Sequence, residues 1–134
     1  MVEIIVETHV KPTESVDKVK RALANLVFLE NIEIEEIFSG FKLVRIKCQV
    51  MDCLEPFRRK IKAQQIGPAV RNYSYKHISN GELTLLLHKQ AAFADKISLI
   101  DSEKESPLGP IKIEARGRPE ELEKLIDYLT SERD

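Results

Sequence analysis

Cysteine, glycine and tryptophan are scarce in this chain, and each shortage excludes a class of function. Of 134 residues, two are Cys, five are Gly and none is Trp. Two cysteines are too few for a disulfide framework or a four-thiolate zinc site, so we expect Cys48 and Cys53 to be small buried thiols. That expectation favours a reducing compartment, and we expect a cytoplasmic location. No run of about 18 apolar residues occurs, and Glu3 and Glu7 interrupt the first segment, so we expect neither a membrane span nor a signal peptide.

The spacing of the glycines and histidines excludes the common catalytic motifs. No two glycines are two positions apart, so neither a phosphate-binding loop nor a dinucleotide-binding fingerprint can be written, and G-x-S-x-G is absent. His9, His77 and His88 lack the close spacing of metal ligands. We therefore expect no cofactor, no metal and no enzymatic activity. A deep pocket joining His88, Lys89 and Cys53 would revive the enzyme alternative.

Length and composition predict one globular domain over residues 1–134. The chain is 43% hydrophobic and 32% charged, and 21 basic against 22 acidic residues give a net charge of −1. These values are typical of a folded domain and do not by themselves indicate a partner.

Hydrophobic periodicity predicts an α+β fold. Alternating or apolar segments predict strands at residues 2–10, 32–38, 42–50, 82–88, 97–100 and 110–116. Spacing of three and four predicts helices at about 14–27, with Thr13 as N-cap, after 52, after 67 and from Pro119. The order βαββα(α)βββα predicts a two-layer sandwich, in which a mostly antiparallel sheet carries its helices on one face.

The two strands around Gly40 predict a β-hairpin. A three-residue loop over 39–41 would pair Ile34 with Ile46 and Glu35 with Arg45, so that apolar side chains share one face and opposite charges the other.

The face of the sheet without helices is predicted to be half apolar. Charged residues from the alternating strands would lie there among four apolar side chains, and such a surface often binds a partner. We expect these four to form the face of a homodimer: Ile5, Ile37, Leu43 and Leu86.

Charge is unevenly distributed, with a basic middle third. Residues 52–96 hold eight basic and four acidic side chains. Cations at such positions can contact phosphates, although a run of charge is more often simply a solvated face. Only Tyr73 and Tyr75 lie in this segment as stacking platforms, which favours contacts with the RNA backbone over successive base stacking.

Two sequence blocks resemble a known family. LHKQAAFADKISLID (87–101) and ESPLGPIKIE (105–114) are similar to the archaeal uncharacterised protein family 0201, UPF0201. The resemblance implies a fold similar to the large-subunit ribosomal protein that binds five-S RNA, a dimeric assembly and a role in RNA binding, with no catalytic residue. Gly67 and Pro68 depart from the family, which more often has helix formers there, and this difference bears on the geometry of Arg71.

Together these observations predict a non-catalytic module that binds structured RNA. The residues expected to contact RNA are Arg58, Arg59, Lys62, Arg71, Lys89 and Gln90. The alternative is a dimeric protein-interaction or scaffold subunit that uses the open sheet face and binds no nucleic acid.

Overall fold

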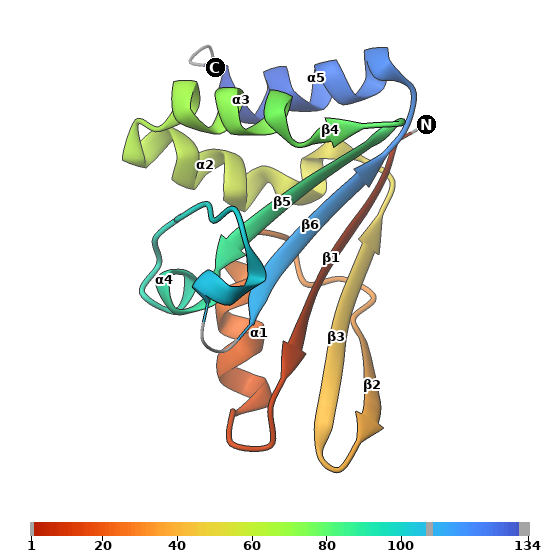
Figure 1. The fold of residues 1–134 in the computed structure, drawn as a ribbon, viewed down its shortest axis with the longest axis vertical. Helices are drawn as coiled ribbons and strands as arrows, with labels where there is room; N and C mark the ends of the chain where they lie inside the picture. Colours follow the sequence, from red (N-terminus) through yellow and green to blue (C-terminus); the bar gives the residue numbers. More distant parts are fainter. Residues whose placement is uncertain (1, 107–108, 132–134) are drawn as a thin grey trace.

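A six-stranded antiparallel sheet organises residues 2–106 and 109–131, the part of the chain that the computed structural model describes (Figure 1). The strand order is β2-β3-β1-β6-β5-β4. The strands are β1 (Glu3–Val10), β2 (Glu33–Phe38), β3 (Phe41–Cys48), β4 (Ile78–Ser79), β5 (Glu82–His88) and β6 (Pro110–Arg116). The helices are α1 (Val16–Ala24), α2 (Glu55–Gln64), α3 (Gly67–Lys76), α4 (Lys89–Phe93) and α5 (Pro119–Thr130), with short 3-10 helices η1 (Met51–Leu54) and η2 (Glu103–Glu105). The predicted α+β class and antiparallel sheet are confirmed.

The sheet buries one face only. In β1, Ile4, Val6 and Val10 are buried, whereas Glu3 and His9, which point to the opposite face, are exposed. Alternate residues of β5 and β6 follow the same pattern. The helices form two groups along the sheet, α2 with α3 and α5 at one end and α1 with α4 at the other (Figure 1).

The last helix agrees with its sequence signals, and the first is shorter than predicted. Pro119 begins α5, and the predicted apolar stripe is buried: Leu122, Leu125, Ile126 and Leu129. By contrast α1 spans only Val16–Ala24, and its N-cap is Ser15, whose hydroxyl accepts the amide of Lys18 at 3.4 Å. Thr13 as N-cap was therefore wrong by two residues.

The hairpin exists, but its register differs from the prediction by two residues. Ile34 pairs with Val44 and Glu35 with Leu43. The loop has only two residues, Ser39 and Gly40, both at positive φ (44° and 83°), as in the tight turns that suit twisted hairpins. A bulge between Glu36 and Phe38 takes up one further residue. Because the shift is even, Glu33, Ile34 and Glu35 keep their predicted faces, whereas the bulge changes the register by one residue at Phe38, which pairs with Phe41.

The predicted strand at 97–100 is wrong. Only an isolated bridge, between Leu87 and Leu99, joins this segment to β5. The Gln64 side chain forms hydrogen bonds with both backbone groups of Ile97. It accepts a hydrogen bond from the Ile97 amide at 2.7 Å and donates one to the Ile97 carbonyl at 3.2 Å. The short helix α4 and the two-residue strand β4, neither of them predicted, complete the order βαββααββαβα.

Gly67 fits a close approach between α3 and α5. A Cβ at this position would lie 2.9 Å from the carbonyl oxygen of Thr130, so the glycine lets the two helices meet. The departure from the family at Gly67 and Pro68 does not interrupt α3, which begins at Gly67 with Pro in its first turn.

Cys48 and Cys53 form a disulfide, which corrects the expectation of two thiols. Strand β3 ends at Cys48, and η1 brings Cys53 back so that the two Cα atoms are 6.6 Å apart, within the usual range for such a bond. The inference of a reducing compartment therefore loses its basis in these residues. In the part of the chain described, none of the helices has the length and apolar character needed to cross a membrane.

Candidate nucleic-acid interface

The two arginines predicted to contact RNA from α2 both interact with Glu55. Arg58 Nη1 lies 3.4 Å and Arg59 Nε 3.3 Å from Glu55 Oε1. The Arg58 side chain is only 17% exposed, donates to the Tyr128 carbonyl at 3.1 Å and stacks over the Tyr128 ring. Arg58 thus joins α2 to α5, whereas Arg59, with a side chain 70% exposed, can reach a ligand.

The other two helix residues predicted to contact RNA, Arg71 and Lys62, also interact with groups of the protein itself. Arg71 Nη1 lies 2.7 Å from Asp127 Oδ1 and 3.2 Å from Thr130 Oγ1, and the hydrogen bond that the guanidinium donates to Asp127 raises the pKa of Arg71. Lys62 is half-buried and also has an interaction partner.

Lys89 is buried, which corrects its assignment as an RNA contact. Its side chain is fully buried, and Nζ donates to the His9 carbonyl at 2.6 Å and lies 3.3 Å from Glu14 Oε1. Burial lowers the pKa of Lys89, and the facing Glu14 carboxylate opposes that shift. The neighbouring Gln90 is exposed, on a helix that packs against α1. The six predicted residues therefore do not form one exposed positive surface.

The open face of the sheet carries a network of paired charges. Glu7 at its centre lies 3.0 Å from Arg45 Nε on β3 and 3.6 Å from Lys112 Nζ on β6. Ile5, Leu43 and Leu86 are half-buried on this face, and Ile37 at its edge is 44% exposed. These four apolar residues lie on the predicted face.

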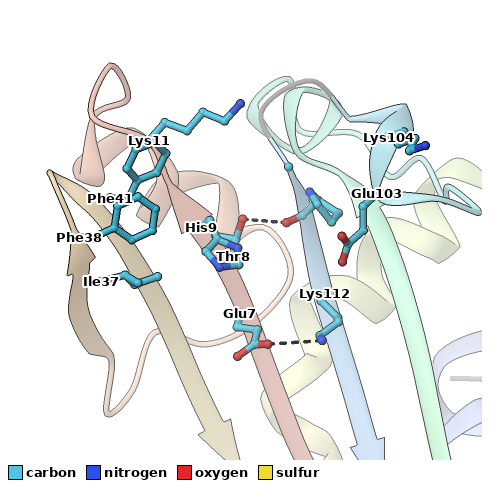
Figure 2. A pocket seen from close by; sticks show the side chains of 12 residues that line it. Glu7, Thr8, His9, Lys11, Ile37, Phe38, Phe41, Glu103, Lys104 and Lys112 are labelled. Atoms are coloured by element: carbon cyan, nitrogen blue, oxygen red, sulfur yellow. Dashed lines mark hydrogen bonds and ion pairs between the residues drawn. The ribbon is translucent and has the colours of Figure 1, made fainter.

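A groove of about 570 Å³ opens at one end of this face (Figure 2). The β2–β3 hairpin lines one side with Ile37, Phe38 and Phe41, and η2 lines the other with Glu103 and Lys104. Between them lie the end of β1 and the start of β6. The groove is thus built from four segments that are far apart in the sequence.

Two phenylalanines stack on the hairpin side of the groove. The ring centroids of Phe38 and Phe41 are 4.9 Å apart with planes inclined by 27°, and Phe38 is 61% exposed. The tight turn at Ser39 and Gly40 places the two rings opposite each other across the hairpin. An exposed aromatic ring is a surface on which a nucleobase can stack.

A buried network holds the neighbouring turn in place. The Lys11 amide donates to Glu14 Oε1 at 2.9 Å, and the same carboxylate faces Lys89, whose ammonium holds the His9 carbonyl. The hairpin tip approaches this turn closely, since a Cβ on Gly40 would lie 3.4 Å from the Pro12 ring. Lys89 therefore positions Lys11 and His9 in the groove without being exposed there.

The charges of the groove are arranged by depth. Glu7 and Lys112 pair on the sheet surface, whereas the Lys11 and Lys104 side chains lie at its upper edge (Figure 2). Glu103 is exposed on the same side as Lys104. The ammonium groups of Lys11 and Lys104 are therefore placed to bind an anion at the rim, and the carboxylate of Glu103 can accept hydrogen bonds from a ligand.

Sequence reasoning missed the groove because it searched for aromatic residues only in the basic segment. The signal available was a pair of phenylalanines on either side of a Ser-Gly turn, which a two-residue loop brings together. The register with a three-residue loop put Phe41 inside the loop and hid that pair.

The residues proposed for an enzyme site have separate structural roles. Cys53 is in the disulfide, Lys89 is buried, and the His88 ring caps α4 by accepting the Ala91 amide at 3.2 Å. Residues 2–106 and 109–131 contain no cluster of three or more His, Cys, Asp or Glu side chains that could bind a metal ion. In the loop 106–110 that carries the family resemblance, Pro107 and Leu108 lie outside the described residues.

Comparison with known proteins gives one consistent result. A family model described as RNA binding matches residues 3–117. A UPF0201 protein of Sulfurisphaera tokodaii is 40% identical over 131 residues, which cover 97% of this chain and 88% of that protein. The crystal structure of a UPF0201 protein from Methanococcus jannaschii superposes with a TM-score of 0.80 at 24% identity, covering 98% of this chain and 94% of that one. The likeness to the ribosomal protein stays a prediction.

Proposed function

Because the chain belongs to the UPF0201 family, we propose that it binds RNA, with the groove at the end of the open sheet face as the main contact. The observation that supports this most is the presence of Lys11 and Lys104 at the rim of a groove that also exposes Phe38 (Figure 2). Ammonium groups attract phosphates, and an aromatic ring accepts a base.

The exposed helix residues supply a weaker second contact in this proposal. The Arg59 side chain is more exposed than those of Arg58, Arg71 and Lys89, and its partner Glu55 is already shared with Arg58 and Tyr128. Lys62 lies on the same helix, and Gln90 is exposed on α4. Arg58 and Arg71 act mainly within the packing of α5, so we assign them no direct part.

RNA binding is tested by filter binding at two salt concentrations. We expect the affinity of the full chain for a mixed RNA pool to fall several-fold between about 50 and 200 mM salt, because each neutralised phosphate releases counterions. Lys104→Glu should weaken binding by about fivefold or more at the lower salt concentration. Lys124→Glu, on α5 and outside the groove, is the matched charge reversal and should have a smaller effect. An absence of binding at low salt would defeat the proposal.

A second copy of the chain is the protein partner that we propose for the centre of the open face. Ile5, Leu43 and Leu86 keep part of their apolar surface exposed there, among charges of both signs. Ile37 lies at the edge of the same face and also lines the groove, so the dimer and the RNA would meet near this residue. Non-enzymatic function and cytoplasmic location remain predictions.

A further inference from the structure

We propose that the groove binds one unpaired nucleotide of an RNA strand, with its base stacked on Phe38 and its phosphates beside Lys11 and Lys104. This inference rests on the proposed RNA binding and narrows it from RNA in general to single-stranded or looped segments.

The exposed ring supports an unpaired base. Phe38 stacks against Phe41, yet 61% of it remains exposed, which leaves most of the side chain accessible to a ligand. Bases inside a duplex already stack on their neighbours and present only their edges, so a protein ring can stack on a base that has left the helix. Base stacking on an aromatic side chain tolerates any sequence, because every base has a π-face.

The size of the groove fits a single nucleotide. Its volume of about 570 Å³ lies within the range of roughly 300–1,000 Å³ typical of sites that enclose a small molecule. Phe38 and Phe41 form one side, and Glu103 and Lys104 form the other, so a flat ring can enter between them (Figure 2). A double helix is too wide to enter a cavity of this size.

The charges determine which end of the nucleotide enters. Inside the groove the ammonium of Lys112 is already paired with Glu7 and Glu114, and the Glu103 carboxylate repels a phosphate. Glu103 is exposed and can accept a hydrogen bond from an exocyclic amine of a base. The base therefore enters the groove and the phosphates remain at the rim, where Lys11 and Lys104 lie.

A peptide is the other ligand that an aromatic groove admits, and the observations favour RNA. An apolar peptide side chain would gain nothing from the lysines at the rim, whereas a nucleotide uses the ring and the lysines together. The stacked pair offers a flat surface, as a base requires.

The test compares three RNAs that contain the same sequence. The first is a single strand of about 12 nucleotides, the second is a hairpin whose loop contains part of that sequence, and the third is a fully paired duplex. Binding is measured by fluorescence anisotropy with the chain of 134 residues. Phe38→Ala should weaken binding of the single strand and the hairpin by about tenfold, as expected for the loss of one stacked base. Phe38→Trp should retain binding, and binding of the duplex should be the same for all variants.

Phe93→Ala is the matched control, because Phe93 is a 38% exposed phenylalanine outside the groove. It should leave all three affinities within about twofold of the original. A single strand carrying the fluorescent base 2-aminopurine adds a direct readout, since stacking quenches its fluorescence. Quenching should occur with the unmodified protein and be lost with Phe38→Ala.

The outcomes separate this inference from the proposed function. If the protein binds RNA with the expected salt dependence but Phe38→Ala binds the single strand as tightly as before, the inference fails and RNA binding stands. Preference for the duplex, or an equal loss in Phe93→Ala, would likewise overturn it. If no RNA binds at low salt, both proposals fail.

Discussion

The ammonium group of Lys89 lies 2.6 Å from the carbonyl oxygen of His9, 80 residues earlier in the sequence. This contact joins the first residue of α4 to the end of β1, and Glu14 completes it from the turn before α1. A charged side chain in this position is costly to bury, and its partners offset that cost only while all of them are present.

We therefore expect Lys89→Met to destabilise the protein by about 3 kcal/mol, because the Glu14 carboxylate would be left buried without its cation. Urea denaturation followed by circular dichroism measures this change. Gln90→Met, at the exposed neighbouring position, should change the free energy of unfolding by less than about 0.5 kcal/mol. Equal stability of the two variants would mean that Lys89 is not buried with Glu14.

Glu55 should make the stability depend on acid pH. The Tyr128 hydroxyl donates to Glu55 Oε2 at 2.5 Å, and this bond, with Arg58 and Arg59, lowers the pKa of the carboxyl below 4.5. A carboxyl whose pKa is lower in the folded state contributes its stability in full above pH 4.5, and that stability is lost as the pH falls through the folded pKa.

Tyr128→Phe removes the largest cause of that shift. We expect it to cost about 1.5 kcal/mol at pH 7 and less at pH 3, because the contribution of this bond to the charged carboxylate decreases as the pH falls toward the folded pKa. Urea denaturation at both pH values gives the difference. Tyr75→Phe, which removes a hydroxyl from an exposed tyrosine, is the control and should cost little at either pH. A cost for Tyr128→Phe that does not change with pH would contradict this account.

Gly67→Ala should destabilise the contact between α3 and α5. The new methyl group would lie 2.9 Å from the Thr130 carbonyl oxygen, so a helix must shift to admit it, at a cost of about 2 kcal/mol. Thermal unfolding measures the loss. Ala69→Ser, exposed on the same helix, should be nearly neutral. A Gly67→Ala variant as stable as the original would show that the helices do not approach so closely.

The Cys48–Cys53 disulfide predicts that the unfolded, unreduced protein has no reactive thiol. Thiol titration in denaturant should detect none before reduction and two afterwards. Replacing both cysteines by serine should lower the free energy of unfolding by about 2 kcal/mol, the loop-closure value for cysteines five residues apart. Two thiols before reduction, in protein purified without a reductant, would contradict the bond.

The proposed dimer is tested by placing a charge on the open face. Leu43→Asp should convert a dimer into a monomer in analytical ultracentrifugation, because a carboxylate would be buried in the interface. Ile34→Asp, on the other face of the edge strand and 43% exposed, should leave the dimer intact. A monomer at micromolar concentration for the unmodified chain, or dissociation by Ile34→Asp alone, would rule out this interface.

The sequence by itself determined the faces of the long elements, although it missed α4 and β4 and predicted a strand at 97–100 that does not form. Alternation in β1 and spacing in α5 indicate which side chains are buried, because the period of a strand or a helix assigns each residue to a side. That is why Ile5, Leu43 and Leu86 were placed on the open face even though the hairpin register was wrong by two residues.

Only the tertiary structure decided which charges remain available to a partner. Arg58 and Arg71 contact α5, and Lys89 reaches the end of β1, through interactions between residues 59 or more positions apart. Local periodicity carries no information about such partners. The groove arises in the same way, since Phe38, Lys11 and Lys104 line one cavity only after the sheet has formed. Burial and ion pairing then determine whether a cation is available to bind RNA or stabilises the fold.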